Sequence, residues 1–207
     1  MPATDWLGLS NRNYATMSSA PEKSPRIVRI LAISGSLRQA SSNTALLRAA
    51  AALAPAGVEI AVYGGLGDLP HFNADLEETL PPPVRDLRAQ LQAAEGVLIS
   101  SPEYAHGVPG VLKNALDWLV GGEEFIGKPV ALLNASPRAT YAYAALSETL
   151  TVMSGRIVTE ASITVPLLGK NLDVQDIVAH REIAETLRGA LVAFVRALET
   201  YRTQAAQ

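Results

Sequence analysis

The chain has 207 residues, of which 48% are hydrophobic and 18% are charged, and its formal net charge at pH 7 is -3. This length is enough for one well-buried core and short for two domains, so we expect a single domain. The net charge is negative, so the chain shows no overall excess of positive charge that would attract nucleic acid. No apolar run approaches the roughly 20 residues that cross a bilayer. The N-terminus lacks the basic-then-apolar pattern of a signal peptide, so we expect no membrane partner and a cytoplasmic location.

The chain contains no cysteine. Disulfides, thiolate nucleophiles and thiolate metal sites are therefore excluded, and we expect no metal centre. Any redox chemistry has to come from a bound cofactor.

Domain organisation follows from a change of pattern near residue 26. Residues 1–25 are rich in Ser, Asn, Pro and Ala and show no sustained periodicity. An apolar run then covers residues 27–33, and alternating strand and helix patterns follow it along the chain. We therefore predict a flexible N-terminal extension over 1–25 and one folded domain over 26–207.

The first strong pattern is a strand that stops where a helix starts. The run 27–33 is nearly continuous in apolar residues, which is typical of a strand buried on both faces. We interpret Gly35 as the turn out of the strand, because only glycine enters positive φ freely. Apolar residues then recur at the helical spacing of Leu46, Leu47, Ala50 and Leu53.

The loop between this strand and helix carries the groups that a phosphate requires. A helix N-terminus has unpaired N–H donors and about half a unit of positive charge. Arg38 offers a fork of donors for two phosphate oxygens. The other polar groups of the predicted site are Ser34, Ser36, Ser41, Asn43 and Thr44. Each alone is an ordinary cap or surface residue, but the set directly after a first buried strand predicts a phosphate site.

The composition of this loop indicates which class of phosphate-bearing ligand it suits. A dinucleotide fingerprint needs G-x-G-x-x-G, and only Gly35 is present. A Walker loop is also absent. Hydroxyl side chains in place of glycines indicate a terminal phosphate monoester, as on a mononucleotide, and FMN is the leading candidate.

The rest of the chain alternates strands with helices. We predict further strands over 58–63, 96–101, 130–133 and 157–165, the last of them interrupted by polar residues. Further helices are predicted over 84–94, 111–120, 142–153 and 183–198. Five strands in this alternation imply an α/β fold, a doubly wound five-stranded parallel sheet with helices on both faces. In the flavodoxin-like order 2-1-3-4-5, the first and third strands are neighbours at the topological switch point. The loops that begin near Ser34 and Ser101 therefore share one crevice.

The loop after the third strand is the second strong pattern, with the sequence PEYAHGVPGVLKNALDW over residues 102–118. It offers backbone N–H groups, a flat aromatic wall and a position without a bulky side chain, which a flavin ring needs. We assign to the cofactor site Pro102, Glu103, Tyr104, His106 and Gly107. Tyr104 is either a stacking partner or a plain wall, and His106 is interpreted as a spacer. Trp118 is interpreted as a core or subunit-interface residue.

The run GSLR over 35–38 with Ser41 and Asn43, together with P-E-Y-x-x-G-x-P-G-x-L-K-N-A-x-D-W over 102–118, resembles the NADPH-dependent FMN reductase family. This family contains flavodoxin-like quinone, chromate and azo-dye reductases. The resemblance implies bound FMN, NADPH or NADH as co-substrate, and ping-pong transfer to a quinone, azo compound, metal oxyanion or free flavin. It also implies a homodimer or homotetramer, for which the helix 111–120 is a candidate contact.

The chain departs from this family in the loop after the fourth strand. In the family this loop closes on the flavin ring and is often rich in glycine, whereas here Pro137, Arg138, Tyr141 and Tyr143 replace most of the glycine. Ser136 remains as a predicted ring contact. Arg138 either meets the extra phosphate of NADPH or is a surface charge.

Two other functions compete with a reductase. A flavodoxin-type electron carrier would lack NAD(P)H turnover, but its usual phosphate loop, T-x-T-G-x-T, and its strongly acidic surface are absent. A hydrolase would need the nucleophile elbow G-x-S-x-G, which the run Ser34 to Arg38 does not match.

Overall fold

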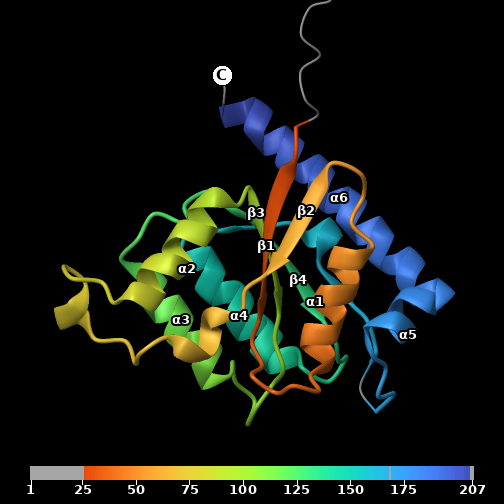
Figure 1. The fold of residues 1–207 in the computed structure, drawn as a ribbon, viewed down its shortest axis with the longest axis horizontal. Helices are drawn as coiled ribbons and strands as arrows, with labels where there is room; N and C mark the ends of the chain where they lie inside the picture. The colour runs from red at the N-terminus through yellow and green to blue at the C-terminus, as the bar shows by residue number, and fades with distance from the viewer. Residues whose placement is uncertain (1–25, 168, 206–207) are drawn as a thin grey trace, which may run out of the picture.

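The computed structural model describes residues 26–167 and 169–205, so the predicted extension over 1–25 lies outside the described residues. Its strands are β1 (Val28–Ser34), β2 (Val58–Val62), β3 (Gly96–Ser100), β4 (Pro129–Asn134), β5 (Arg156–Ile157) and β6 (Ile163–Thr164). All pairings are parallel, in the order β2-β1-β3-β4-β5, with β6 also paired to β4. The predicted order 2-1-3-4-5 is confirmed. The predicted α/β fold is confirmed as well (Figure 1).

The edge of the sheet beyond β4 differs from the prediction, which placed one strand over 157–165 there. Two strands of two residues occupy it, separated by a 3₁₀ turn over Thr159–Ala161. The Ser162 hydroxyl fills the gap in the ladder, because it accepts a hydrogen bond from the Leu132 amide at 3.1 Å and donates one to the Val158 carbonyl at 2.9 Å. The described sheet therefore has six strands, since the polar residues interrupt the fifth.

Helices cover both faces of the sheet (Figure 1). They are α1 (Ser42–Ala52), α2 (Pro82–Ala93), α3 (Gly110–Val120), α4 (Thr140–Val152), α5 (Val174–Ala179) and α6 (Arg181–Ala205), with short 3₁₀ turns over Gly65–Asp68 and Ala74–Leu76. The short helix α5 was not predicted; a reciprocal capping box between Asp173 and Asp176 starts it. No helix among the described residues combines the length and apolarity that a membrane crossing requires.

Two hydrophobic cores lie on opposite faces of the sheet. Ile30 and Ala32 of β1 point into the core under α1, α5 and α6, whereas Leu31 and Ile33 point into the core under α2, α3 and α4. Because both faces are covered, the strand has no polar face, which explains its continuous apolar sequence.

The close packing of β1 against β3 brings two loops together. Ser34 and Ser100 are register partners at the ends of these strands, and the Gly35 amide donates to the Ser100 carbonyl at 2.8 Å. A Cβ on Gly35 would lie 2.6 Å from the Ser101 hydroxyl oxygen, yet Gly35 does not have a positive φ. The interpretation of Gly35 as a positive-φ turn was therefore wrong, because the residue is needed for the close approach of Ser101.

Candidate functional site

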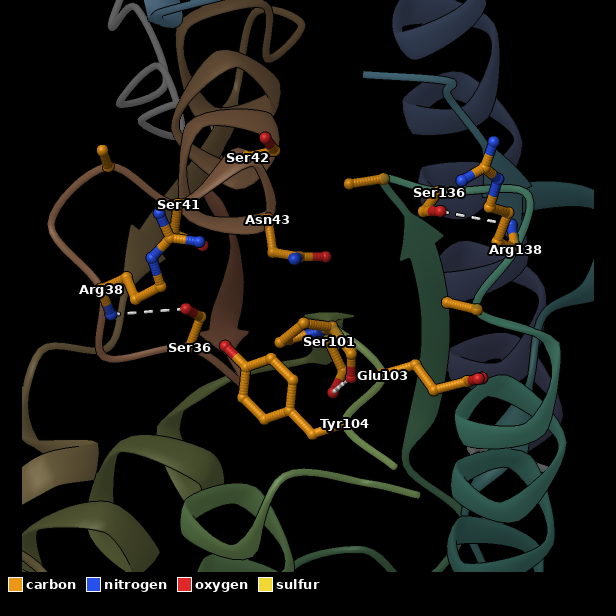
Figure 2. A pocket seen from close by; sticks show the side chains of 14 residues that line it. Ser36, Arg38, Ser41, Ser42, Asn43, Ser101, Glu103, Tyr104, Ser136 and Arg138 are labelled. Atoms are coloured by element: carbon orange, nitrogen blue, oxygen red, sulfur yellow. Dashed lines mark hydrogen bonds between the residues drawn. The ribbon is translucent and has the colours of Figure 1, made fainter. Parts of the chain in front are cut away.

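A pocket of about 310 Å³ lies at the carboxyl edge of the sheet, where the loops after β1, β3 and β4 meet. Its lining residues are Ser36, Arg38 and 40–43 from the first loop and helix, 101–104 from the second loop, and Ala135, Ser136, Arg138 and Ala139 from the third. Figure 2 shows the three sets of side chains around a common space. The volume lies at the lower end of the roughly 300 to 1,000 Å³ that is usual for ligand pockets.

Local hydrogen bonds order the first loop and leave donors for a ligand. Ser41 caps α1 and accepts a hydrogen bond from the Thr44 amide at 3.3 Å, and the Ser36 hydroxyl accepts one from the Arg38 amide at 3.3 Å. Both hydroxyls accept in these bonds, so each retains its own proton to donate. The Arg38 guanidinium points into the pocket (Figure 2), and no ion pair between described side chains involves it.

Asn43 is oriented by a residue of the neighbouring strand. Its Oδ1 accepts a hydrogen bond from the Ser100 hydroxyl at 2.9 Å, and the Ser100 side chain is fully buried. Since the amide oxygen is used in this way, the Nδ2 group carries two donors toward the pocket. Ser100 is thus a positioning residue that the sequence did not single out, because its partner lies 57 positions away.

The second loop begins with a tight turn beside the pocket. Tyr104 and Gly107 exchange two backbone hydrogen bonds of 3.1 and 2.9 Å. Between them Ala105 and His106 have φ values of 48° and 59°, the pattern of a type I′ turn without its usual glycines. The Tyr104 ring is 52% exposed and forms one wall of the pocket (Figure 2).

Two contacts attach the second loop to the start of α4. Helix α4 has no side-chain cap of its own, and Glu103 Oε2 accepts a hydrogen bond from its Ala142 amide at 2.9 Å. A carboxylate at this position also interacts favourably with the positive end of the helix dipole. At the adjacent residue of α4, the His106 ring stacks on Tyr141 with the ring centroids 4.3 Å apart and the planes 3° from parallel.

The third loop is a compact turn instead of a glycine-rich one. Asn134 Oδ1 accepts a hydrogen bond from the Ser136 amide at 3.0 Å, and the Ser136 hydroxyl accepts one from the Arg138 amide at 3.2 Å. Arg138 and Arg38 line the pocket from opposite loops, and Glu103 is the acidic residue among its lining residues. The pocket therefore has one more cation than anion in its lining.

The structure separates the predicted site residues into two groups. The pocket is lined by Ser36, Arg38, Ser41, Asn43, Pro102, Glu103, Tyr104 and Ser136. Ser34, Thr44, His106 and Gly107 do not line it. The Ser34 and Thr44 hydroxyls hydrogen-bond to each other at 2.7 Å and face a neighbouring hollow, while His106 and Gly107 lie farther out on the second loop.

The pocket also contains residues that were not predicted as ligand contacts. These are Ala40, Ser42, Ser101, Ala135 and Ala139. Arg138, for which an NADPH contact and a surface charge were both open, also lines the pocket. Ser42 and Ser101 directly adjoin predicted positions, so proximity in the sequence could have identified them. Trp118, for which core and interface were both open, is fully buried, and its indole N–H donates to the Pro70 carbonyl at 2.8 Å.

A doubly wound parallel sheet with a hydroxyl- and arginine-bearing loop at its switch point defines a flavodoxin-like protein with a mononucleotide-type site. The family model described as NADPH-dependent FMN reductase matches residues 28–166. The chain therefore belongs to the NADPH-dependent FMN reductase family.

Curated relatives match about half of the chain. It is 42% identical over 112 residues to an NAD(P)H-dependent FMN reductase of Pseudomonas aeruginosa. It is 38% identical over 113 residues to a quinone reductase of Escherichia coli. Each alignment covers 53% of this chain and 60% of the relative, so the chain matches less than two thirds of the length of these proteins.

Solved structures resemble a larger part of the chain. FerB of Paracoccus denitrificans, a flavoenzyme NAD(P)H:(acceptor) oxidoreductase, has a TM-score of 0.67 and 27% identity, covering 84% of this chain and 99% of that protein. An NADH:FMN oxidoreductase in its apo form has a TM-score of 0.58 and 19% identity, with coverage of 81% and 88%. The second likeness shows the fold alone.

Proposed function

We propose that this protein is an FMN-dependent NAD(P)H oxidoreductase that delivers electrons to a small-molecule acceptor. The acceptor classes are quinones, azo compounds, metal oxyanions and free flavin, and the kinetics are ping-pong. The observation that carries this proposal is the single pocket formed by both sequence motifs, in a chain of the NADPH-dependent FMN reductase family.

The first loop fits the phosphate end of FMN. The first turn of α1 offers backbone N–H groups, Ser36 and Ser41 offer hydroxyl protons, and the Asn43 amide is aimed by Ser100. Arg38 supplies the charge without a carboxylate partner among the described side chains. The donors outnumber the acceptors here, as an anionic ligand requires.

The second and third loops fit the ring end. The Tyr104 ring provides a flat wall (Figure 2), and residues 101–103 line the pocket beside it. Glu103 fixes the start of α4, so that Ser136 and Ala139 face the ring position. FMN held by these loops would supply the redox chemistry, taking up a hydride from the nicotinamide and returning it to an acceptor that gains its remaining proton from water. The chain would then need no acid–base residue of its own. The role of the protein is to bind and orient both reactants.

The mouth of the pocket is open enough for exchange of reactants. Tyr104, which lines the pocket, is 52% exposed, so an aromatic surface borders the entrance. Flat acceptors such as quinones stack favourably on surfaces of this kind. An open entrance supports sequential use of one site by the nicotinamide and the acceptor.

We also propose a homodimer or homotetramer. Because Trp118 is buried in the core, the contact through α3 would use the outer side of that helix, where Val120 is 64% exposed. Light scattering with an absolute mass determination checks this assembly, and a monomer at micromolar concentration would contradict it.

Absorbance spectroscopy tests the proposed function directly. The purified protein, reconstituted with FMN and desalted, should keep the flavin spectrum and bleach when NADPH is added without oxygen. Addition of a quinone should restore the oxidised spectrum, and steady-state turnover should proceed without any protein partner. Retained flavin that neither NADPH nor NADH bleaches would instead favour the electron carrier.

A further inference from the structure

A second hollow of about 430 Å³ lies on the other side of the first loop, between that loop and the end of β2. We call it the β2 hollow; it is lined by Ser34, Ser36, Leu37, Arg38, Gln39, Thr44, Arg48, Val62, Tyr63, Gly64 and Leu66. It shares Ser36 and Arg38 with the pocket described above, so the two cavities have a common rim. A ligand that extends over this rim can occupy both.

The β2 hollow is positively charged. Arg38 and Arg48 line it, and none of its lining residues is acidic. Neither guanidinium takes part in any ion pair between described side chains. Two arginines that face one cavity without a carboxylate attract an anion, and their forked donors match the oxygens of a phosphate.

Arg48 differs from Arg38 in the cavity that it serves. Arg38 stands on the common rim and is assigned to the FMN phosphate, whereas Arg48 does not line the FMN pocket. Arg48 lies between the β2 hollow and a further hollow that contains Asp173, with which it forms no ion pair. Arg48 follows Thr44 by four positions, so both lie on one side of α1. The Thr44 and Ser34 hydroxyls, 2.7 Å apart, add polar groups beside it.

The other side of the β2 hollow is apolar. Val62 and Leu66 line it from the end of β2 and the following 3₁₀ turn, and Leu37 borders it with 61% of its surface exposed. A cavity with phosphate-binding groups on one side and apolar surface on the other suits a nucleoside phosphate better than a free inorganic ion.

We propose that the β2 hollow binds the adenosine 2′-phosphate of NADPH, with Arg48 as the residue that recognises it. The inference rests on the proposed function, because it places the nicotinamide of the same molecule over the FMN pocket across the common rim. The 2′-phosphate is the group that NADH lacks. Arg48 therefore makes the protein prefer NADPH.

Isothermal titration of the FMN-saturated protein tests the binding site. The probes are 2′,5′-ADP, 5′-AMP, which lacks the 2′-phosphate, and inorganic phosphate. We expect 2′,5′-ADP to bind once per chain, at least about tenfold more tightly than either other probe, since a charge-assisted hydrogen bond is lost without the 2′-phosphate. Arg48→Gln should abolish this difference. Arg188→Gln, which alters an exposed arginine on α6, should preserve it.

Steady-state kinetics provide a second readout. Arg48→Gln should raise the KM for NADPH about tenfold more than the KM for NADH. An unchanged NADPH preference in Arg48→Gln, or equal binding of 2′,5′-ADP and 5′-AMP to the unaltered protein, would overturn the inference. Loss of the preference in Arg138→Gln instead would also overturn it and assign the 2′-phosphate to the third loop.

The two proposals fail in distinguishable ways. If NADPH bleaches the unaltered protein and Arg48→Gln equally well, the reductase function stands. Only the role of the β2 hollow in NADPH binding is then contradicted. A protein that retains no FMN contradicts the reductase function, and titration of the same preparation with 2′,5′-ADP still shows whether Arg48 binds a nucleoside phosphate.

Discussion

The first and third loops of the pocket are ordered in different ways. The first loop is held by hydrogen bonds between residues two or three positions apart, such as Arg38 to Ser36 and Thr44 to Ser41. The third loop has local bonds too, but the helix that follows it is capped by Glu103, 39 positions away. A short motif therefore supplies most of the polar groups at the phosphate end, where Asn43 alone is oriented by the distant Ser100. The ring end instead depends on two distant loops being packed together.

The largest effect is expected from removal of the charge in the first loop. Arg38→Ala should lower FMN affinity by about 10- to 100-fold, since a hydrogen bond to a charged group contributes roughly 1.5 to 3 kcal/mol. Fluorescence titration of the apoprotein with FMN measures this. The exposed Arg188→Gln variant is the matched control, and equal affinities in the two variants would contradict the assignment of Arg38.

Gly35 tests how closely the first loop must approach the second. Gly35→Ala places a Cβ 2.6 Å from the Ser101 hydroxyl oxygen and 3.1 Å from Leu112 Cδ2, so it should destabilise the fold by about 1 to 3 kcal/mol. Urea unfolding measures the loss. The second substitution Ser101→Gly should recover part of it, because Ser101 supplies the two shortest contacts. A Gly35→Ala protein as stable as the original would show that the approach is not restrictive.

Glu103 tests the dependence of the third loop on the second. Glu103→Ala removes the cap of α4 and should cost about 1 kcal/mol of stability, with a severalfold loss of FMN affinity as the third loop loosens. Glu103→Gln keeps an oxygen acceptor and should restore most of the stability. If both variants lose FMN affinity equally without a change in unfolding, Glu103 contacts the cofactor through its charge instead.

The smallest effect is expected from Tyr63, which follows β2 and lines the β2 hollow. Burial, followed by the carboxylate of Asp86, raises the pKa of Tyr63 to about 12. The folded protein then binds more protons than the unfolded chain above pH 10, so stability falls as the pH rises from 10 toward 12.

Tyr63→Phe should reduce this alkaline loss. It should leave the stability at pH 7 unchanged or slightly higher, because the Tyr63 hydroxyl is buried without a hydrogen-bond partner among the described residues. Urea unfolding of both proteins at pH 8 and pH 11 measures the difference. An identical loss in the two proteins would show that other groups cause it.

Some features of the site follow from the sequence and others do not. Apolar runs and helical spacing predicted the alternation of strands and helices, because strand and helix periodicity is a local property. The strand order, and with it the meeting of the loops after β1 and β3, followed from the flavodoxin-like fold that this alternation and the family resemblance implied. Polar residues predicted an interruption in the last strand, but its division into two separate strands was not predicted, since that depends on which carbonyl the Ser162 hydroxyl reaches. The capping role of Glu103 was missed for the same reason, because the Ala142 amide comes near only after folding.

The sequence by itself determined the fold class and the polar composition of the first loop, since both are written in short stretches of chain. Only the tertiary structure decided how these groups are shared between two cavities: Ser34 and Thr44 turn toward the β2 hollow, while Ser41 and Asn43 face the pocket. The physical reason is that successive residues of a helix are rotated about its axis, so the side chains of its first turn point to different sides. Which of the two cavities a residue faces is set by the strand that packs beside it.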